Sequence, residues 1–186
     1  MFATLNDLLV PMAAATPGSG EIFASEFFGT AILLMFGVGT CCTNNLLKSK
    51  GNGGGWLMIN FGWGLAVYMG VYAAYKTGGH LNPAVTIMKA VWHGLDSNVT
   101  LNGPSVAEGG IPVTGMNVCI YIVAQMLGAM VGALIAYLAY KKHFDLQMDD
   151  PRPKLWCFST APEVRSYGWN TLTEIIGTFG LLAFVM

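Results

Sequence analysis

The stretch Gly78-Gly79-His80-Leu81-Asn82-Pro83-Ala84-Val85-Thr86 decides the predicted fold, because it starts a helix in an unusual place. Asn at the N-cap followed by Pro at the first helical position is a strong start signal. The two glycines before it let the backbone bend and approach its neighbours closely. The predicted helix, residues 82–92, is about 16 Å long, roughly half of a ~30 Å hydrocarbon core. The stretch therefore predicts a half-helix that follows an irregular loop.

The distribution of charge indicates that this half-helix lies in a membrane. Hydrophobic residues make up 54% of the chain and charged residues 10%. The charges fall in clusters, and the gaps between them reach the ~20 uncharged residues that a spanning helix needs. The predicted spans are residues 22–43, 56–75 and 118–140, and a fourth begins within residues 171–186. We therefore expect an all-α, multi-pass protein of the cell membrane, with the lipid bilayer around it.

Several classes of function lack support in this sequence. The net charge of -1 provides no basic surface for nucleic acid. The three histidines lie in different predicted elements without ligand spacing, and the four cysteines form neither a CxxC pair nor a zinc pattern. The chain contains no HExxH or GxSxG motif that would indicate an enzyme. We expect no catalytic activity, metal, cofactor or nucleic-acid partner.

An internal repeat predicts the architecture. Residues 25–36 align with residues 173–184 with six identities in twelve positions, at an offset of 174 − 26 = 148. Three spans separate the copies, so the second copy would enter the bilayer from the opposite side, as in the inverted repeats of many transporters. The expected organisation is an N-terminal tail at 1–20, the first repeat at 21–140, a loop at 141–170 and a truncated second repeat at 171–186.

The second copy of the repeat stops in mid-helix, so we expect the natural protein to continue beyond Met186. The offset then predicts a second Asn-Pro-Ala motif near residue 82 + 148 = 230, with allowance for loops of unequal length.

Small residues at intervals of four mark the faces on which the spans pack. In lipid there is no hydrophobic drive between helices, and small residues let backbones approach closely. The two stripes are Gly62, Ala66, Gly70 and Ala74 in the second span, and Ala124, Gly128, Gly132 and Ala136 in the third. They predict a compact bundle, unless they only reflect the general abundance of small residues in membrane helices.

Polar residues at membrane depth are the candidates for supporting the irregular loop. Glu26 lies a few residues into the first span, and the repeat places Glu174 at the equivalent position. A carboxylate is costly there, and irregular backbone in a membrane must be satisfied by protein or water. We expect both residues to accept hydrogen bonds from such backbone, although exposure at a helix end is an alternative for one of them. Gln125 could contribute in the same way or face a neighbouring helix.

The loop itself is the candidate binding surface. Carbonyl groups of Gly78, Gly79, His80 and Leu81 would be exposed as acceptors where the backbone lines a wet cavity. The half-helix would direct its positive dipole end and the donors of Asn82 toward the bilayer midplane. A neutral hydroxylated solute finds both kinds of partner there, whereas a cation or proton meets a positive field.

Residues 79–86, together with Glu26-Phe27-Phe28-Gly29-Thr30, resemble the major intrinsic protein family of aquaporins and glycerol facilitators. The resemblance implies six spans, two half-helices whose Asn-Pro-Ala ends meet midway, and a homotetramer with one pore per subunit. Asn82, Pro83 and Ala84 match the first pore motif. His80 matches the loop histidine of the family, which is a structural residue or, in some relatives, a pH gate.

Trp63 carries the prediction of solute class. It resembles the filter tryptophan of glycerol facilitators, where water-selective members usually have Phe, but it could also be a packing residue. The leading hypothesis is a passive channel for glycerol, water and other small uncharged solutes that excludes ions and protons. A water-selective channel is the first alternative, and a non-conducting membrane scaffold is the second.

The segment from Gly94 to Gly115 is longer than the connection expected before the third span. It contains Gly-Pro and Gly-Gly pairs, so it forms either a mobile loop or an ordered cap.

Overall fold

The computed structural model describes residues 15–146 and 149–185, and these residues form only helices, turns and loops. The α-helices are α2 (Ser19–Asn45), α3 (Gly55–Ala73), α4 (Pro83–Leu95), α5 (Gly115–Ala139), α6 (Lys141–Phe144), α7 (Arg152–Leu155) and α8 (Tyr167–Val185), and the 3-10 helices are η1 (Tyr75–Thr77) and η2 (Val106–Glu108). Three of them, α2, α3 and α5, are long and apolar enough to cross a membrane. The predicted all-helical membrane fold is confirmed.

The ends of the elements differ from the predicted bounds. Most of the tail predicted for residues 1–20 lies outside the described residues, and its last two residues belong to α2. The helix starts early because Glu21 Oε2 accepts a hydrogen bond from Gly18 N at 2.9 Å, which satisfies one of the free N–H groups there. The predicted loop at 141–170 contains the short helices α6 and α7 and the first turn of α8.

Helix α2 packs on α5 through the small residues of the third span. A Cβ atom at Gly128 would overlap the carbonyl oxygen of Phe27, and one at Gly132 would overlap that of Ala31. Ala124 and Ala136 of the same stripe are buried. The backbones of the two helices therefore touch, and only glycine allows this approach. Gly128 meets Phe27, and Gly132, four residues later, meets Ala31, which is four residues after Phe27. The helices α2 and α5 therefore run parallel.

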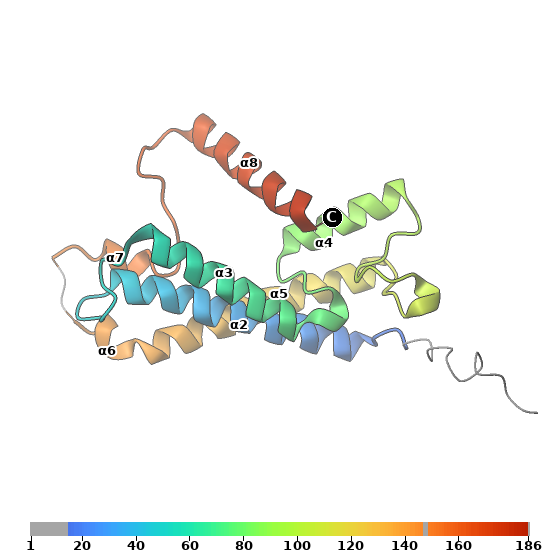
Figure 1. The fold of residues 1–186 in the computed structure, drawn as a ribbon, viewed down its shortest axis with the longest axis horizontal. Helices are drawn as coiled ribbons and strands as arrows, with labels where there is room; N and C mark the ends of the chain where they lie inside the picture. Colours follow the sequence, from blue (N-terminus) through green and yellow to red (C-terminus); the bar gives the residue numbers. More distant parts are fainter. Residues whose placement is uncertain (1–14, 147–148, 186) are drawn as a thin grey trace, which may run out of the picture.

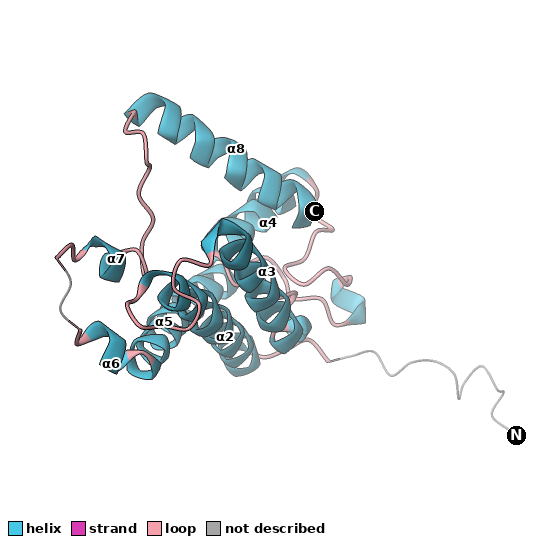
Figure 2. Cartoon of the chain, turned by 60° about the vertical axis from the view of Figure 1, so that its left-hand side comes forward, coloured by secondary structure: helices cyan, strands magenta, loops and turns pink. Residues whose placement is uncertain are grey.

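The other side of α2 packs on α3 (Figure 1). A Cβ at Gly70 would lie 2.8 Å from the carbonyl oxygen of Gly29, and one at Gly29 would lie 2.9 Å from that of Gly70. Ala66 and Ala74 of the α3 stripe are also buried. Figure 2 shows the three helices as one bundle, and α2 contacts both of the others. Helix α2 therefore contacts both α3 and α5, and its side chains can bond to residues associated with either helix.

Helix α4 follows α3 after an irregular loop and contacts α5, whereas α8 contacts α4 (Figure 1). The connection between α4 and α5 is an ordered cap: Leu101 N donates to Ile111 O at 3.0 Å. Both side chains are buried in a cluster with Ile22 and Tyr121. This packing answers the question that the sequence left open for the segment, because buried apolar side chains tie it to α2 and α5.

Candidate functional site

The loop between α3 and α4 has a left-handed backbone at three positions. The φ angles are 82° at Gly78, 57° at Gly79 and 53° at Leu81. Glycine adopts this region freely, whereas Leu does not. At Gly79 a side chain would also be crowded, because a Cβ would lie 3.1 Å from the Cα of Val71. A strained residue such as Leu81 persists only where its surroundings fix it.

Glu26 of α2 holds this loop. Its Oε1 accepts hydrogen bonds from Thr77 Oγ1 at 2.8 Å and from His80 N at 3.2 Å. Its Oε2 accepts from Leu81 N at 2.9 Å and from Gln125 Nε2 at 2.9 Å. The carboxylate is fully buried, so these four donors replace its water. Two of them are backbone N–H groups of the loop, and this anchors the strained Leu81.

Both ring nitrogens of His80 are engaged. Nε2 lies 2.7 Å from Leu101 O, and Nδ1 lies 3.0 Å from Thr86 Oγ1. A carbonyl oxygen can only accept, so Nε2 carries the hydrogen, and in the neutral ring Nδ1 accepts from the Thr86 hydroxyl. His80 is buried and links the loop to the cap.

Gln125 of α5 completes the network. Its Nε2 donates to Glu26 Oε2 and, at 3.1 Å, to Thr86 Oγ1. The side-chain amide of Gln125 therefore connects Glu26 on α2 with Thr86 in the first turn of α4. Its Oε1 is buried without a hydrogen-bond partner among the described residues. Tyr121, one turn earlier on α5, donates from its hydroxyl to Thr77 O at 2.7 Å, and its ring lies 4.7 Å from that of His80.

Helix α4 begins after Asn82 because Asn82 and Pro83 are well suited to the N-terminus of a helix. Asn82 has an extended backbone, and its Oδ1 accepts from Ala84 N at 2.9 Å, while Pro83 fills the first helical position. Since Oδ1 is used in the cap, the Nδ2 group is left as a donor. Asn82 is half-buried.

The carbonyl groups of the loop are hydrogen-bond acceptors, in contrast to the Nδ2 donor of Asn82. Within the described part of the chain, no donor reaches the carbonyl oxygens of Gly78, Gly79, His80 or Leu81. The N–H groups of His80 and Leu81, by contrast, are bonded to Glu26. Four successive carbonyl groups of the loop therefore have no partner in the described chain, and Asn82 with its Nδ2 donor is the next residue along the chain.

Trp63 lies apart from this loop. It is ten residues before the end of α3, about 15 Å along the helix axis. Its indole packs on Gly37 of α2, where a Cβ would overlap the ring. Its Nε1 donates to Cys41 Sγ at 3.3 Å. The residue is half-buried, so one side of the indole is packed and the other is open in the described chain.

Glu174 is not brought to the loop. It lies on α8, where it is exposed, and among the described residues it has neither a hydrogen bond nor an ion pair. The sequence grouped it with Glu26 and Gln125, but only those two meet.

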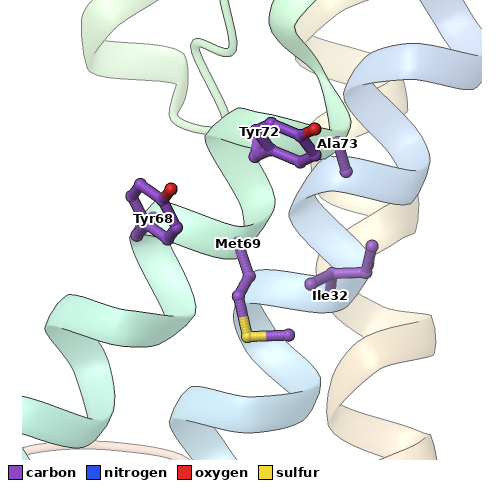
Figure 3. Close-up of a pocket in the computed structure, with 5 residues that line it drawn as sticks. All are labelled: Ile32, Tyr68, Met69, Tyr72 and Ala73. Carbon is purple, nitrogen blue, oxygen red and sulfur yellow. The ribbon is translucent and has the colours of Figure 1, made fainter.

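A groove on the α2–α3 face contains none of the predicted site residues. It is lined by Ile32, Tyr68, Met69, Tyr72 and Ala73 (Figure 3). Its walls are mainly apolar side chains from two packed helices. No group of three or more His, Cys, Asp or Glu residues suited to a metal occurs in the residues that the structure describes.

The sequence analysis missed Thr77, Thr86, Tyr121 and the carbonyl of Leu101. A signal existed for Tyr121, because the i, i+4 spacing places it on the same face of α5 as Gln125. The others depend on the path of two loops, and no local pattern specifies that path.

Comparison of the sequence with known proteins shows the family. The family model described as "Major intrinsic protein" matches residues 15–186. A "Probable glycerol uptake facilitator protein" of Thermotoga maritima is 43% identical over 167 residues, which cover 89% of this chain and 63% of the relative. The "Glycerol uptake facilitator protein" of Bacillus subtilis is 41% identical, with 88% and 53% covered.

A fungal relative, the "Aquaglyceroporin-2" of Rhizophagus irregularis, is 35% identical, with 89% of this chain and 48% of the relative covered. The chain thus spans about half to two thirds of the length of these curated relatives. No solved structure gave a significant match.

Proposed function

Because this chain belongs to the major intrinsic protein family, we propose that the protein is a passive transmembrane channel for glycerol and other small uncharged solutes, water included. The curated relatives from Thermotoga maritima and Bacillus subtilis carry the name glycerol uptake facilitator, which supports glycerol as the solute. In this proposal the described chain supplies the first half of the pore.

The observation that carries the proposal is a set of carbonyl acceptors without partners, followed in the chain by the donor of Asn82. The carbonyl groups from Gly78 to Leu81 have no partner in the described chain, and Asn82 Nδ2 follows them directly. A solute with hydroxyl groups exchanges its water for such acceptors and donors in sequence as it passes. A purely apolar wall would not do this.

Exclusion of ions and protons follows from the same element. Helix α4 begins at Pro83, and a helix N-terminus carries a partial positive charge. The donor of Asn82 adds to this field. A cation or a proton moving along water would meet it after losing its hydration, whereas an uncharged solute would not.

The framework behind the loop supports the proposal because it is rigid. Glu26, His80 and Gln125 fix the loop from α2, the cap and α5 through hydrogen bonds of 2.7 to 3.2 Å. A selective path needs its polar groups held in place, so that each replaces one contact of the solute with water.

Trp63 is proposed as one wall of a narrow filter. The packed side of its indole is fixed by Gly37 and Cys41, which leaves the open side to face the CH edge of glycerol. Glu174 is proposed to hold a second loop in the same way as Glu26 does, and the whole protein is proposed to assemble as a homotetramer.

The test is stopped-flow light scattering of proteoliposomes that contain the full-length protein, under glycerol, urea and sucrose gradients. A glycerol channel accelerates swelling in glycerol above protein-free liposomes and generates no proton conductance with a pH-sensitive dye. Water flux without glycerol flux would assign the protein to the water-selective class. No flux of either would favour the membrane scaffold.

A further inference from the structure

We propose that Cys42 and Cys157 form a disulfide bond that fixes the segment after α5 to the end of α2. The two residues are 157 − 42 = 115 positions apart, and both are buried, with exposures of 0% and 2%. They belong to one packed cluster with Val38, Leu46 and Ala136. The fold therefore brings together two thiols that the sequence gives no reason to pair.

The two thiols are members of the same small buried cluster, which joins the end of α2 to the residues after α7. Cys157 Sγ lies 3.3 Å from Pro153 O, to which it donates a hydrogen bond. The neighbouring Cys42 lowers the pKa of the Cys157 thiol, burial opposes this, and Asn45 lowers the pKa further. Of the two, Cys157 is thus the better source of the nucleophilic thiolate.

Both thiols face the same compartment. Because α2 and α5 run parallel, their C-terminal ends lie on the same side of the membrane. Cys42 is near the end of α2, and Cys157 follows α7 in the connection after α5 (Figure 1). A single redox environment therefore acts on the pair, and an oxidising one preserves the bond.

Formation of the bond requires a small disulfide as the oxidant, such as oxidised glutathione. The thiolate of Cys157 attacks one sulfur of this disulfide, and the first small thiolate leaves. Cys42 then loses its proton and attacks Cys157 Sγ, which forms the protein disulfide and releases the second small thiolate. The two released thiolates take up the two protons. Because both protein thiols are buried once docked, the exchange occurs during folding or when the α7 region opens.

The bond would act on the region beside Trp63. Cys41, adjacent to Cys42, accepts the hydrogen bond from Trp63 Nε1, and Gly37 lies under the same indole. Oxidation would fix this end of the bundle, whereas reduction would release the connection from it. Cys119 is exposed near the start of α5 and provides a matched control.

The test uses the full-length protein in membranes. Reduced protein is treated with oxidised glutathione, blocked with N-ethylmaleimide in denaturant, digested without reductant and examined by mass spectrometry. The expected result is a cross-linked peptide pair containing Cys42 and Cys157 that disappears with reductant, while Cys119 is alkylated. Alkylation of both Cys42 and Cys157, or pairing of either with Cys41, would overturn the proposal.

A second measurement does not depend on peptide recovery. The oxidised wild type should melt at a higher temperature than the reduced wild type, and Cys119→Ser should keep this difference. Cys42→Ser and Cys157→Ser should each abolish it. An oxidation-dependent difference that persists in both of these variants would contradict the assignment.

Discussion

The clearest prediction concerns Glu26→Gln, which changes one oxygen of the anchor into an amide nitrogen. The new NH₂ group must replace either Oε1 or Oε2. At Oε2 it would face two donors, Leu81 N and Gln125 Nε2. At Oε1 it would face His80 N and the hydroxyl of Thr77, which can rotate to accept. The second orientation is favoured, and it leaves only His80 N without an acceptor.

The expected loss follows from that one orphaned group. A buried donor left without a partner costs about 1–3 kcal/mol, so we expect a loss of about 2 kcal/mol. For a domain of this size that corresponds to a fall of roughly 4–8 °C in the melting temperature. Amide hydrogen exchange should also increase at His80 and Leu81, because the loop opens more often.

The matched control is Glu21→Gln on the same helix. Glu21 is exposed and bonds only to Gly18 N at the start of α2, so this variant should melt close to the wild type. The measurements are thermal unfolding in detergent and hydrogen exchange by mass spectrometry. If Glu26→Gln and Glu21→Gln melt together and exchange at residues 78–81 is unchanged, the anchoring role of Glu26 is refuted.

Three further predictions follow from the packing and the site. His80→Phe keeps an aromatic ring beside Tyr121 but leaves Leu101 O and Thr86 Oγ1 without this partner. The free energy of unfolding should fall by about 2–4 kcal/mol, measured as a lower melting temperature, and His93→Phe should lower the melting temperature less. Gly128→Ala places a Cβ on the carbonyl oxygen of Phe27 and should lower the free energy of unfolding by about 1–3 kcal/mol, so that size-exclusion chromatography yields less monodisperse protein. Gly115→Ala has open space around it and should not reduce the yield. Equal yields of the two variants would contradict the close approach of α2 and α5. Trp63→Ala should admit urea and larger polyols several-fold faster relative to glycerol in proteoliposomes, and an unchanged ranking of solutes would remove Trp63 from the filter.

The fold was accessible from the sequence because its signals are local. The Asn82-Pro83 pair starts a helix without help from distant residues, and the stripes of small residues are read directly from their spacing. The outcome for Gly128 and Gly132, which lie on the carbonyl groups of α2, shows why the spacing is informative. Only close backbone contact makes a larger residue unacceptable at every fourth position.

The network around the loop was accessible only in part. Glu26 and Gln125 stand out because polar groups are rare and costly at membrane depth. Thr77, Thr86 and Leu101 do not stand out, since hydroxyl and carbonyl groups occur throughout the chain and become partners only when the loops are folded. Cys42 and Cys157 likewise come into one cluster only when the chain is folded. Glu174 shows the limit of the repeat: the alignment equates it with Glu26, but no loop lies beside it in the described chain.

The position of the anchor has a consequence for synthesis. Glu26 is made early, yet two of its partners, His80 and Leu81, follow 54 and 55 residues later, and Gln125 follows 99 residues later. At about 5–20 residues per second, a ribosome takes roughly 5–20 s to reach Gln125. Until these partners are made, the carboxylate of Glu26 lacks the donors that bond to it in the folded bundle. We therefore expect α2 to stay near water during synthesis and to enter the bilayer together with the helices that supply its partners.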